Sequence, residues 1–166
     1  NEIAVLFRAG YQSYHVEVEL NKLGLAFRKY GGIKFSEAAH IKDVLACLRV
    51  IQNIQDLPSW QRILSNIPRV GPKTAEKIHR AILINDQKFL QAQKTKLPPL
   101  NDLLQMLNVL RSQALSPASA ITFILDYYLP VLREKFPDDY PRREAGLEEL
   151  QQIAQGYEQV DTFLSD

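Results

Sequence analysis

The chain has 166 residues, 46% of them hydrophobic and 23% charged, and its formal net charge is +1 at pH 7. These values are typical of one domain with a sizeable core and exclude a disordered or low-complexity segment. No run approaches the roughly 18 apolar residues of a membrane-spanning helix, so we expect no membrane partner. The single cysteine, Cys47, excludes an internal disulfide framework and favours a cytoplasmic protein, and no cluster of histidine and cysteine predicts a metal site.

The N-terminal residues predict the start of an α/β unit. Residues 3–7 form a continuous apolar run, typical of a strand buried on both faces. Ser13 can cap a helix that ends at Gly24, and residues 26–30 form a second short strand pattern. About 30 residues cannot complete a covered sheet. Because the chain also starts without methionine, we expect it to be a piece of a longer protein that supplies the rest.

From Ser36 onward the apolar residues recur at the helix period, which predicts a mainly α-helical body. Pro130 should end or kink the helix that contains it, because proline cannot donate to the carbonyl four residues earlier. Residues 136–139 are expected to form a loop. The expected helices cover 36–51, 59–66, 74–83, a segment capped by Asn101, a segment starting at Ser116-Pro117, and a last one from about Arg142 to Leu164.

The net charge hides an asymmetry between two parts of the chain. Residues 1–96 contain 15 of the 20 basic residues and 8 of the 19 acidic ones, for a net charge of +7. Residues 97–166 contain the other 5 basic and 11 acidic residues, for a net charge of −6. Either the first part meets an anionic partner, or these are ordinary solvated faces whose signs have segregated.

The most informative stretch is residues 63–78, where two short helices flank a tight turn. Gly71 is expected to supply the backbone freedom of the turn, and Thr74 to cap the second helix. Backbone amides at a helix start, with Lys73 beside them, form an anion-binding site. The same residues do not form a nucleotide-binding phosphate loop, because Pro72 stands where that loop needs glycine before the lysine.

This stretch resembles the helix-hairpin-helix motif, which holds nucleic-acid phosphates without reading bases. Arg69, Lys77, Arg80 and Lys88 add to its positive charge. The motif commonly has glycine at both ends of its hairpin, whereas here Arg69 occupies the first place. The alternative is a plain helix-turn-helix corner of an all-α domain.

A second stretch, Tyr30-Gly31-Gly32-Ile33-Lys34-Phe35 followed by residues 40–51, combines a glycine hinge, an aromatic plug and an amphipathic helix. Together with Ala4-Val5-Leu6-Phe7-Arg8 and Gln12-Ser13, it resembles superfamily 1 DNA helicases of the UvrD, Rep and PcrA type. The resemblance implies that residues 1–30 are a truncated strand-helix-strand of the RecA-like subdomain 2A. Residues 31–166 would then be the helical 2B subdomain, with its duplex-contacting loop at residues 68–74.

The resemblance further implies the duplex-engaging, regulatory part of an ATP-dependent 3′-to-5′ DNA helicase in repair or replication restart. The longer helicase chain would use ATP and Mg²⁺. This segment lacks a Walker A loop, a Walker B motif and a γ-phosphate arginine, so we expect no catalytic residue and no ATP turnover here. Expected partners are duplex DNA, the rest of the helicase chain and a repair or transcription protein.

The residues expected to bind nucleic acid and to form a hinge follow from these two stretches. Gly31 and Gly32 are the expected hinge between the subdomains. Two alternatives stay open: a stand-alone, non-enzymatic helix-hairpin-helix DNA-binding module, and a protein-interaction module. The expected phosphate contacts are Arg69, Gly71, Lys73, Thr74 and Lys77, with Lys34 as a weaker candidate.

Overall fold

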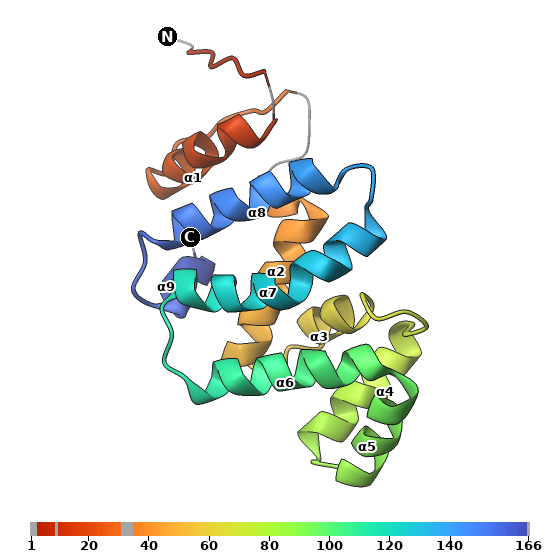
Figure 1. Cartoon of the computed structure of the whole chain (residues 1–166). Helices are drawn as coiled ribbons and strands as arrows, with labels where there is room; N and C mark the ends of the chain where they lie inside the picture. The colour runs from red at the N-terminus through yellow and green to blue at the C-terminus, as the bar shows by residue number, and fades with distance from the viewer. Residues whose placement is uncertain (1–2, 9, 31–34, 166) are drawn as a thin grey trace.

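The computed structural model describes residues 3–8, 10–30 and 35–165, and in these ranges the chain is mainly helical (Figure 1). This confirms the predicted mainly α fold. Among these helices, none has both the length and the apolar character that crossing a bilayer requires. The elements are η1 (Gly10–Ser13), α1 (Tyr14–Lys22), η2 (Phe35–Glu37), α2 (Ala39–Gln52), α3 (Leu57–Leu64), α4 (Pro72–Leu83), α5 (Gln87–Lys96), α6 (Pro98–Ser112), α7 (Pro117–Lys135), α8 (Tyr140–Ala154) and α9 (Val160–Ser165).

The predicted N-terminal strand-helix-strand is confirmed only for its helix, α1. Residues 3–8 and 25–30 are not part of a β ladder, and the described residues contain no strand. A strand needs a hydrogen-bonded neighbour to satisfy its backbone groups, and in the described residues neither segment is paired with one. Ile3 and Leu6 are accordingly more than 90% exposed. The predicted hinge residues Gly31 and Gly32, and Lys34, lie outside the described residues.

Helix α1 is held to the body through a buried carboxylate. Glu17 is 6% exposed, accepts a hydrogen bond from the Phe35 backbone amide at 3.2 Å, and pairs with Lys29 Nζ at 2.6 Å. The rings of Tyr14 and Phe35 pack with centroids 4.3 Å apart. Leu23, which follows the last residue of α1, is exposed.

The body is built around α2, which α6, α7, α8 and α9 all contact. Figure 1 shows α6, α7 and α8 stacked beside one another with α2 crossing behind them. Ile41, Val44 and Leu48 on α2 are fully buried, as the helix period predicted. The core therefore lies between α2 and the three stacked helices.

Several helix boundaries differ from the prediction for local reasons. Helix α6 starts at Pro98, not at an Asn101 cap, because proline at the first helical position has no amide to satisfy. Pro130 was expected to end or kink its helix, and the structure excludes the end: α7 continues through it to Lys135, with buried residues on both sides, including Leu132, that hold the helix against the core. The long last helix is two, α8 and α9, separated by a turn around Gly156. The predicted cap at Ser116 is confirmed, since its side chain accepts from the Ser119 amide at 3.3 Å.

Candidate nucleic-acid interface

The hairpin consists of α3, the turn 65–71 and α4. Asp56 caps α3 by accepting from the Ser59 amide at 3.1 Å. In the turn, the Val70 amide donates to the Ile67 carbonyl at 3.1 Å, and both side chains are buried, at 7% and 2% exposed. Burial of these two side chains anchors the turn, so the residues between and after them face solvent.

Arg69 has a left-handed backbone, with φ at +70°. This conformation favours glycine and costs other residues on the order of 1 kcal/mol. The structure thus gives a physical reason why related hairpins have glycine at this place. The guanidinium Nη2 of Arg69 donates to the Lys96 carbonyl at 3.4 Å, which brings α5 beside the turn.

Gly71 differs from the prediction, because its backbone is extended (φ −92°, ψ 176°) and needs no glycine. A Cβ atom at this position would meet nothing within 4 Å. Neither strain nor crowding within the chain therefore accounts for a glycine here. What the missing side chain does provide is open access to the backbone at the start of α4.

The start of α4 offers backbone donors. Gly71 is the N-cap and makes no side-chain hydrogen bond, and Pro72 occupies the first helical position. The prediction that Thr74 caps the helix is wrong, because Thr74 lies in the first turn itself and the Ala75 amide donates to the Gly71 carbonyl at 2.9 Å. The amides of Lys73 and Thr74 thus point out of an N-terminus without a side-chain cap, the arrangement that binds anions elsewhere.

Positive charge surrounds this helix start. Lys73 and Lys77 are exposed and four residues apart on α4, and in the described part of the chain neither they nor Arg69 form an ion pair. Arg80, one turn further on, approaches Glu76 at 3.9 Å. The structure thus brings the predicted Arg69, Lys73 and Lys77 to one hairpin and leaves their charges uncompensated.

A buried carboxylate that sequence reasoning missed holds the hairpin in place. Asp43 on α2 is 5% exposed and accepts hydrogen bonds from Arg62 Nη1 at 2.8 Å, Asn66 Nδ2 at 3.2 Å and the Tyr128 hydroxyl at 2.7 Å. Burial, and then the charge of Asp43, raises the pKa of Tyr128, so the phenol keeps the proton that it donates. Asp43 therefore ties α2 to α3, to the turn and to α7.

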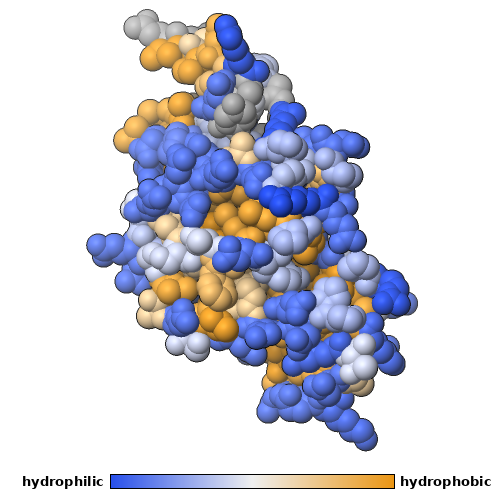
Figure 2. All heavy atoms as spheres, in the orientation of Figure 1, coloured by the Kyte–Doolittle hydropathy of each residue, from blue (hydrophilic) through white to orange (hydrophobic). Residues whose placement is uncertain are grey.

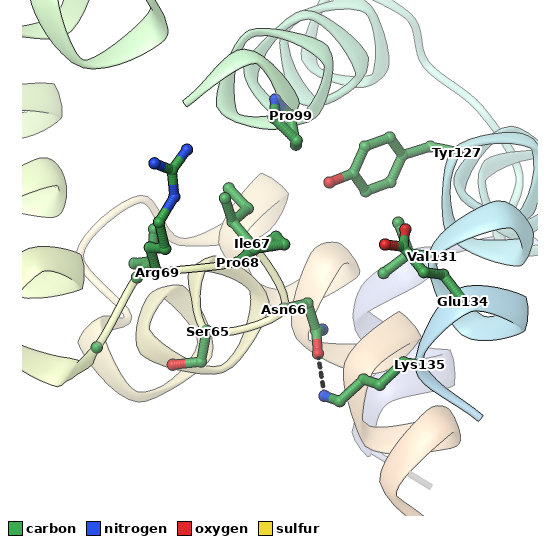
Figure 3. Close-up of a pocket in the computed structure, with 12 residues that line it drawn as sticks. Ser65, Asn66, Ile67, Pro68, Arg69, Pro99, Tyr127, Val131, Glu134 and Lys135 are labelled. Atoms are coloured by element: carbon green, nitrogen blue, oxygen red, sulfur yellow. Dashed lines mark hydrogen bonds between the residues drawn. The ribbon is translucent and has the colours of Figure 1, made fainter. Parts of the chain in front are cut away.

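The turn also borders a cavity of about 720 Å³ that Figure 3 shows between residues 65–71 and α7. Tyr127, Val131 and Glu134 on α7 form the opposite wall. Lys135 lies at the edge of this cavity, and its Nζ donates to Asn66 Oδ1 at 2.7 Å (Figure 3). Asn66 is thus held from two sides, by Asp43 and by Lys135.

Trp60 and His79 are structural residues at the base of the hairpin. Trp60 Nε1 donates to the Ile54 carbonyl at 2.9 Å, and His79 Nε2 lies 2.9 Å from the same oxygen. The two rings pack with centroids 5.9 Å apart, and Trp60 is 1% exposed. A buried indole cannot serve as a base-stacking platform.

The backbone of Arg69 leads to a prediction with two opposite effects. Arg69→Gly should raise the free energy of unfolding by up to about 1 kcal/mol, because it relieves the left-handed strain. It should also weaken binding to polyanions, because one charge of the hairpin is lost. Urea denaturation and duplex titration of the same preparation measure both effects. Arg69→Ala, which keeps the strain and removes the charge, is the control; equal stability of the two variants would contradict the strain argument.

Two comparisons show which known proteins the chain is similar to. The family described as "UvrD-like helicase C-terminal domain" matches residues 1–159. The chain is 42% identical over 94 residues to the ATP-dependent DNA helicase PcrA of Bacillus subtilis (strain 168), and 38% identical over 94 residues to PcrA of Staphylococcus epidermidis. Both matches cover 55% of this chain and 13% of the relative, so the matched region spans only a small part of those proteins. The chain belongs to the UvrD-like helicase C-terminal domain family.

Proposed function

We propose that this chain is the duplex-engaging part of an ATP-dependent DNA helicase that moves 3′ to 5′. Residues 1–30 are assigned to the RecA-like subdomain 2A and residues 31–166 to the helical subdomain 2B. The family match and the similarity to PcrA support this assignment. The exposed apolar residues of segment 3–8 also support it, because the sheet of a longer chain would cover them.

The observation that carries the proposal is the uncapped, basic start of α4. The amides of Lys73 and Thr74 donate to a backbone phosphate, and the missing side chain of Gly71 lets that phosphate approach. Lys73, Lys77 and Arg69 neutralise neighbouring phosphates. None of these groups reads a base edge, so the hairpin positions duplex DNA without sequence preference.

The rest of the proposed mechanism belongs to the longer chain. ATP and Mg²⁺ are bound by its RecA-like subdomains, because no phosphate-binding loop occurs in this sequence. Gly31 and Gly32 act as the hinge between the subdomains, and Lys34 is a further phosphate contact. A repair or transcription protein is the proposed protein partner.

The test is duplex binding at several salt concentrations. Each phosphate neutralised contributes about −0.9 to the slope of log K against log salt, so Arg69, Lys73 and Lys77 together should contribute about −2 to −3. Lys73→Glu should reduce both the affinity and the slope, by similar factors for duplexes of unrelated sequence. Fluorescence anisotropy of labelled duplexes measures both quantities.

Glu148→Lys is the matched control, since Glu148 is exposed on α8 and its replacement also changes the net charge by two. This variant should keep the affinity of the parent chain or gain slightly through its added charge. If Lys73→Glu binds duplex with the affinity and salt slope of the unsubstituted chain, the hairpin has only a structural role and does not bind DNA. If the parent chain binds no duplex even at low salt, the surface serves a protein partner instead.

A further inference from the structure

Helix α5 carries lysines that lie outside the hairpin and have no role in the function proposed above. Its ten residues, Gln87–Lys96, include three lysines and no acidic residue. Leu90 is buried on one side, while Lys88 and Lys96 are exposed on the other. With a rise of 1.5 Å per residue, these two lysines lie roughly 12 Å apart along the helix axis.

The helix dipole explains only part of this pattern. Lys96 is in the last turn, where a positive charge stabilises a helix. Lys88 is the second residue of α5, where the same dipole disfavours a cation. In the described part of the chain, Lys88 has no ion pair that would compensate. The charge of Lys88 therefore does not serve the stability of its own helix.

The exposed side of α5 is continuous with the hairpin. Arg69 Nη2 reaches the Lys96 carbonyl at 3.4 Å, so the C-terminal end of α5 lies against the turn. Helix α5 also packs on α4, which carries Lys73 and Lys77. Figure 1 places both helices at the lower end of the molecule, and Figure 2 shows mainly hydrophilic side chains covering that end.

We propose that Lys88 and Lys96, here called the α5 ridge, form a second contact with the backbone phosphates of the same duplex. The hairpin holds one phosphate on the amides of α4, and the α5 ridge neutralises phosphates further along the DNA. The ligand is duplex DNA of any sequence, because lysine ammonium groups at this spacing meet phosphates rather than base edges. This inference rests on the proposed function and extends its site from the turn to α5.

The experiment removes the two charges without reversing them. Lys88→Gln with Lys96→Gln should lower the affinity for duplex and make the salt slope less steep by about 1.8, which is two contacts at about 0.9 each. Lys88→Arg with Lys96→Arg should keep the slope of the parent chain. Arg28→Gln with Arg142→Gln is the matched control, because both arginines are exposed and lie on segments away from α5.

The outcomes separate this inference from the proposed function. If the glutamine pair binds with the slope of the parent while Lys73→Glu does not, the hairpin binds DNA alone and the α5 ridge is a solvated surface. If the control pair loses as much slope as the ridge variant, the effect is one of net charge, which also overturns the inference. Circular dichroism at each salt concentration checks that every variant stays folded, as expected for exposed side chains.

Discussion

Replacing Asp43 with alanine should lower the free energy of unfolding by about 1–3 kcal/mol, a sizeable part of the stability of an ordinary domain. Asp43 is buried and accepts hydrogen bonds from three side chains on three different segments. Without it, the hydroxyl of Tyr128 is left in the core with no acceptor, and a buried donor without a partner is costly. Urea denaturation followed by the fluorescence of the single tryptophan, Trp60, measures the loss.

Two variants test this explanation. Asp43→Asn keeps the shape and one carbonyl acceptor, so it should lose less than Asp43→Ala. Asp126→Ala, an exposed carboxylate on α7, should change the stability by no more than about 0.5 kcal/mol. A stability of Asp43→Ala within that same margin would mean that the network does not hold the hairpin. Duplex affinity should fall with Asp43→Ala as well, because Asn66 loses one of its two anchors.

The second large effect is a loss of stability in mild acid, caused by His40. Burial, followed by the nearby charge of Arg143, lowers the pKa of His40 from 6.5 to about 4, although Asp43 and Asp139 oppose this shift. Neither ring nitrogen has a hydrogen-bond partner among the described residues, and a Cβ atom on Gly146 would lie 2.8 Å from Nε2, so the ring is closely enclosed. The folded protein therefore favours the neutral imidazole.

The direction of the effect follows from proton uptake. As the pH falls below 6.5, the unfolded chain protonates this histidine while the folded chain does not, and unfolding becomes easier. The loss continues until the pH reaches about 4 and amounts to roughly 3 kcal/mol from this group alone. His40→Leu, which cannot titrate, should lack this contribution when denaturation of both proteins is compared between pH 7 and pH 4. Parallel pH profiles of the parent and His40→Leu would contradict it.

Local patterns in the sequence predicted much of this fold. The apolar period of α2 and the two short helices α3 and α4 around a turn follow from residues close in the chain, and the structure contains both. The errors arose where tertiary packing or proline chemistry decides, as in α7, which continues through Pro130, and in α4, which starts at Pro72 rather than at Thr74. In the described residues the two N-terminal strand patterns do not form strands, since a ladder depends on a neighbouring strand.

Only part of the candidate site could be predicted from the sequence. The basic residues of the hairpin are neighbours in the chain, so their pattern could be seen. The support beneath them could not, because Asp43 meets Arg62, Asn66 and Tyr128 across 19, 23 and 85 residues. The only sequence signal was an acidic residue between Ile41 and Val44 on an apolar helix. The left-handed backbone conformation of Arg69 could not be predicted either, because arginine rarely adopts this conformation.

The central claim is that backbone amides at the start of α4 bind a DNA phosphate, and nuclear magnetic resonance tests it most directly. A short duplex is titrated into the ¹⁵N-labelled chain, and amide shifts are followed residue by residue. We expect the largest shifts at Gly71, Lys73 and Thr74, in the same order for two duplexes of unrelated sequence, and their loss at high salt. Duplex binding that leaves these three amides unmoved, with shifts gathered on another surface, would contradict the account.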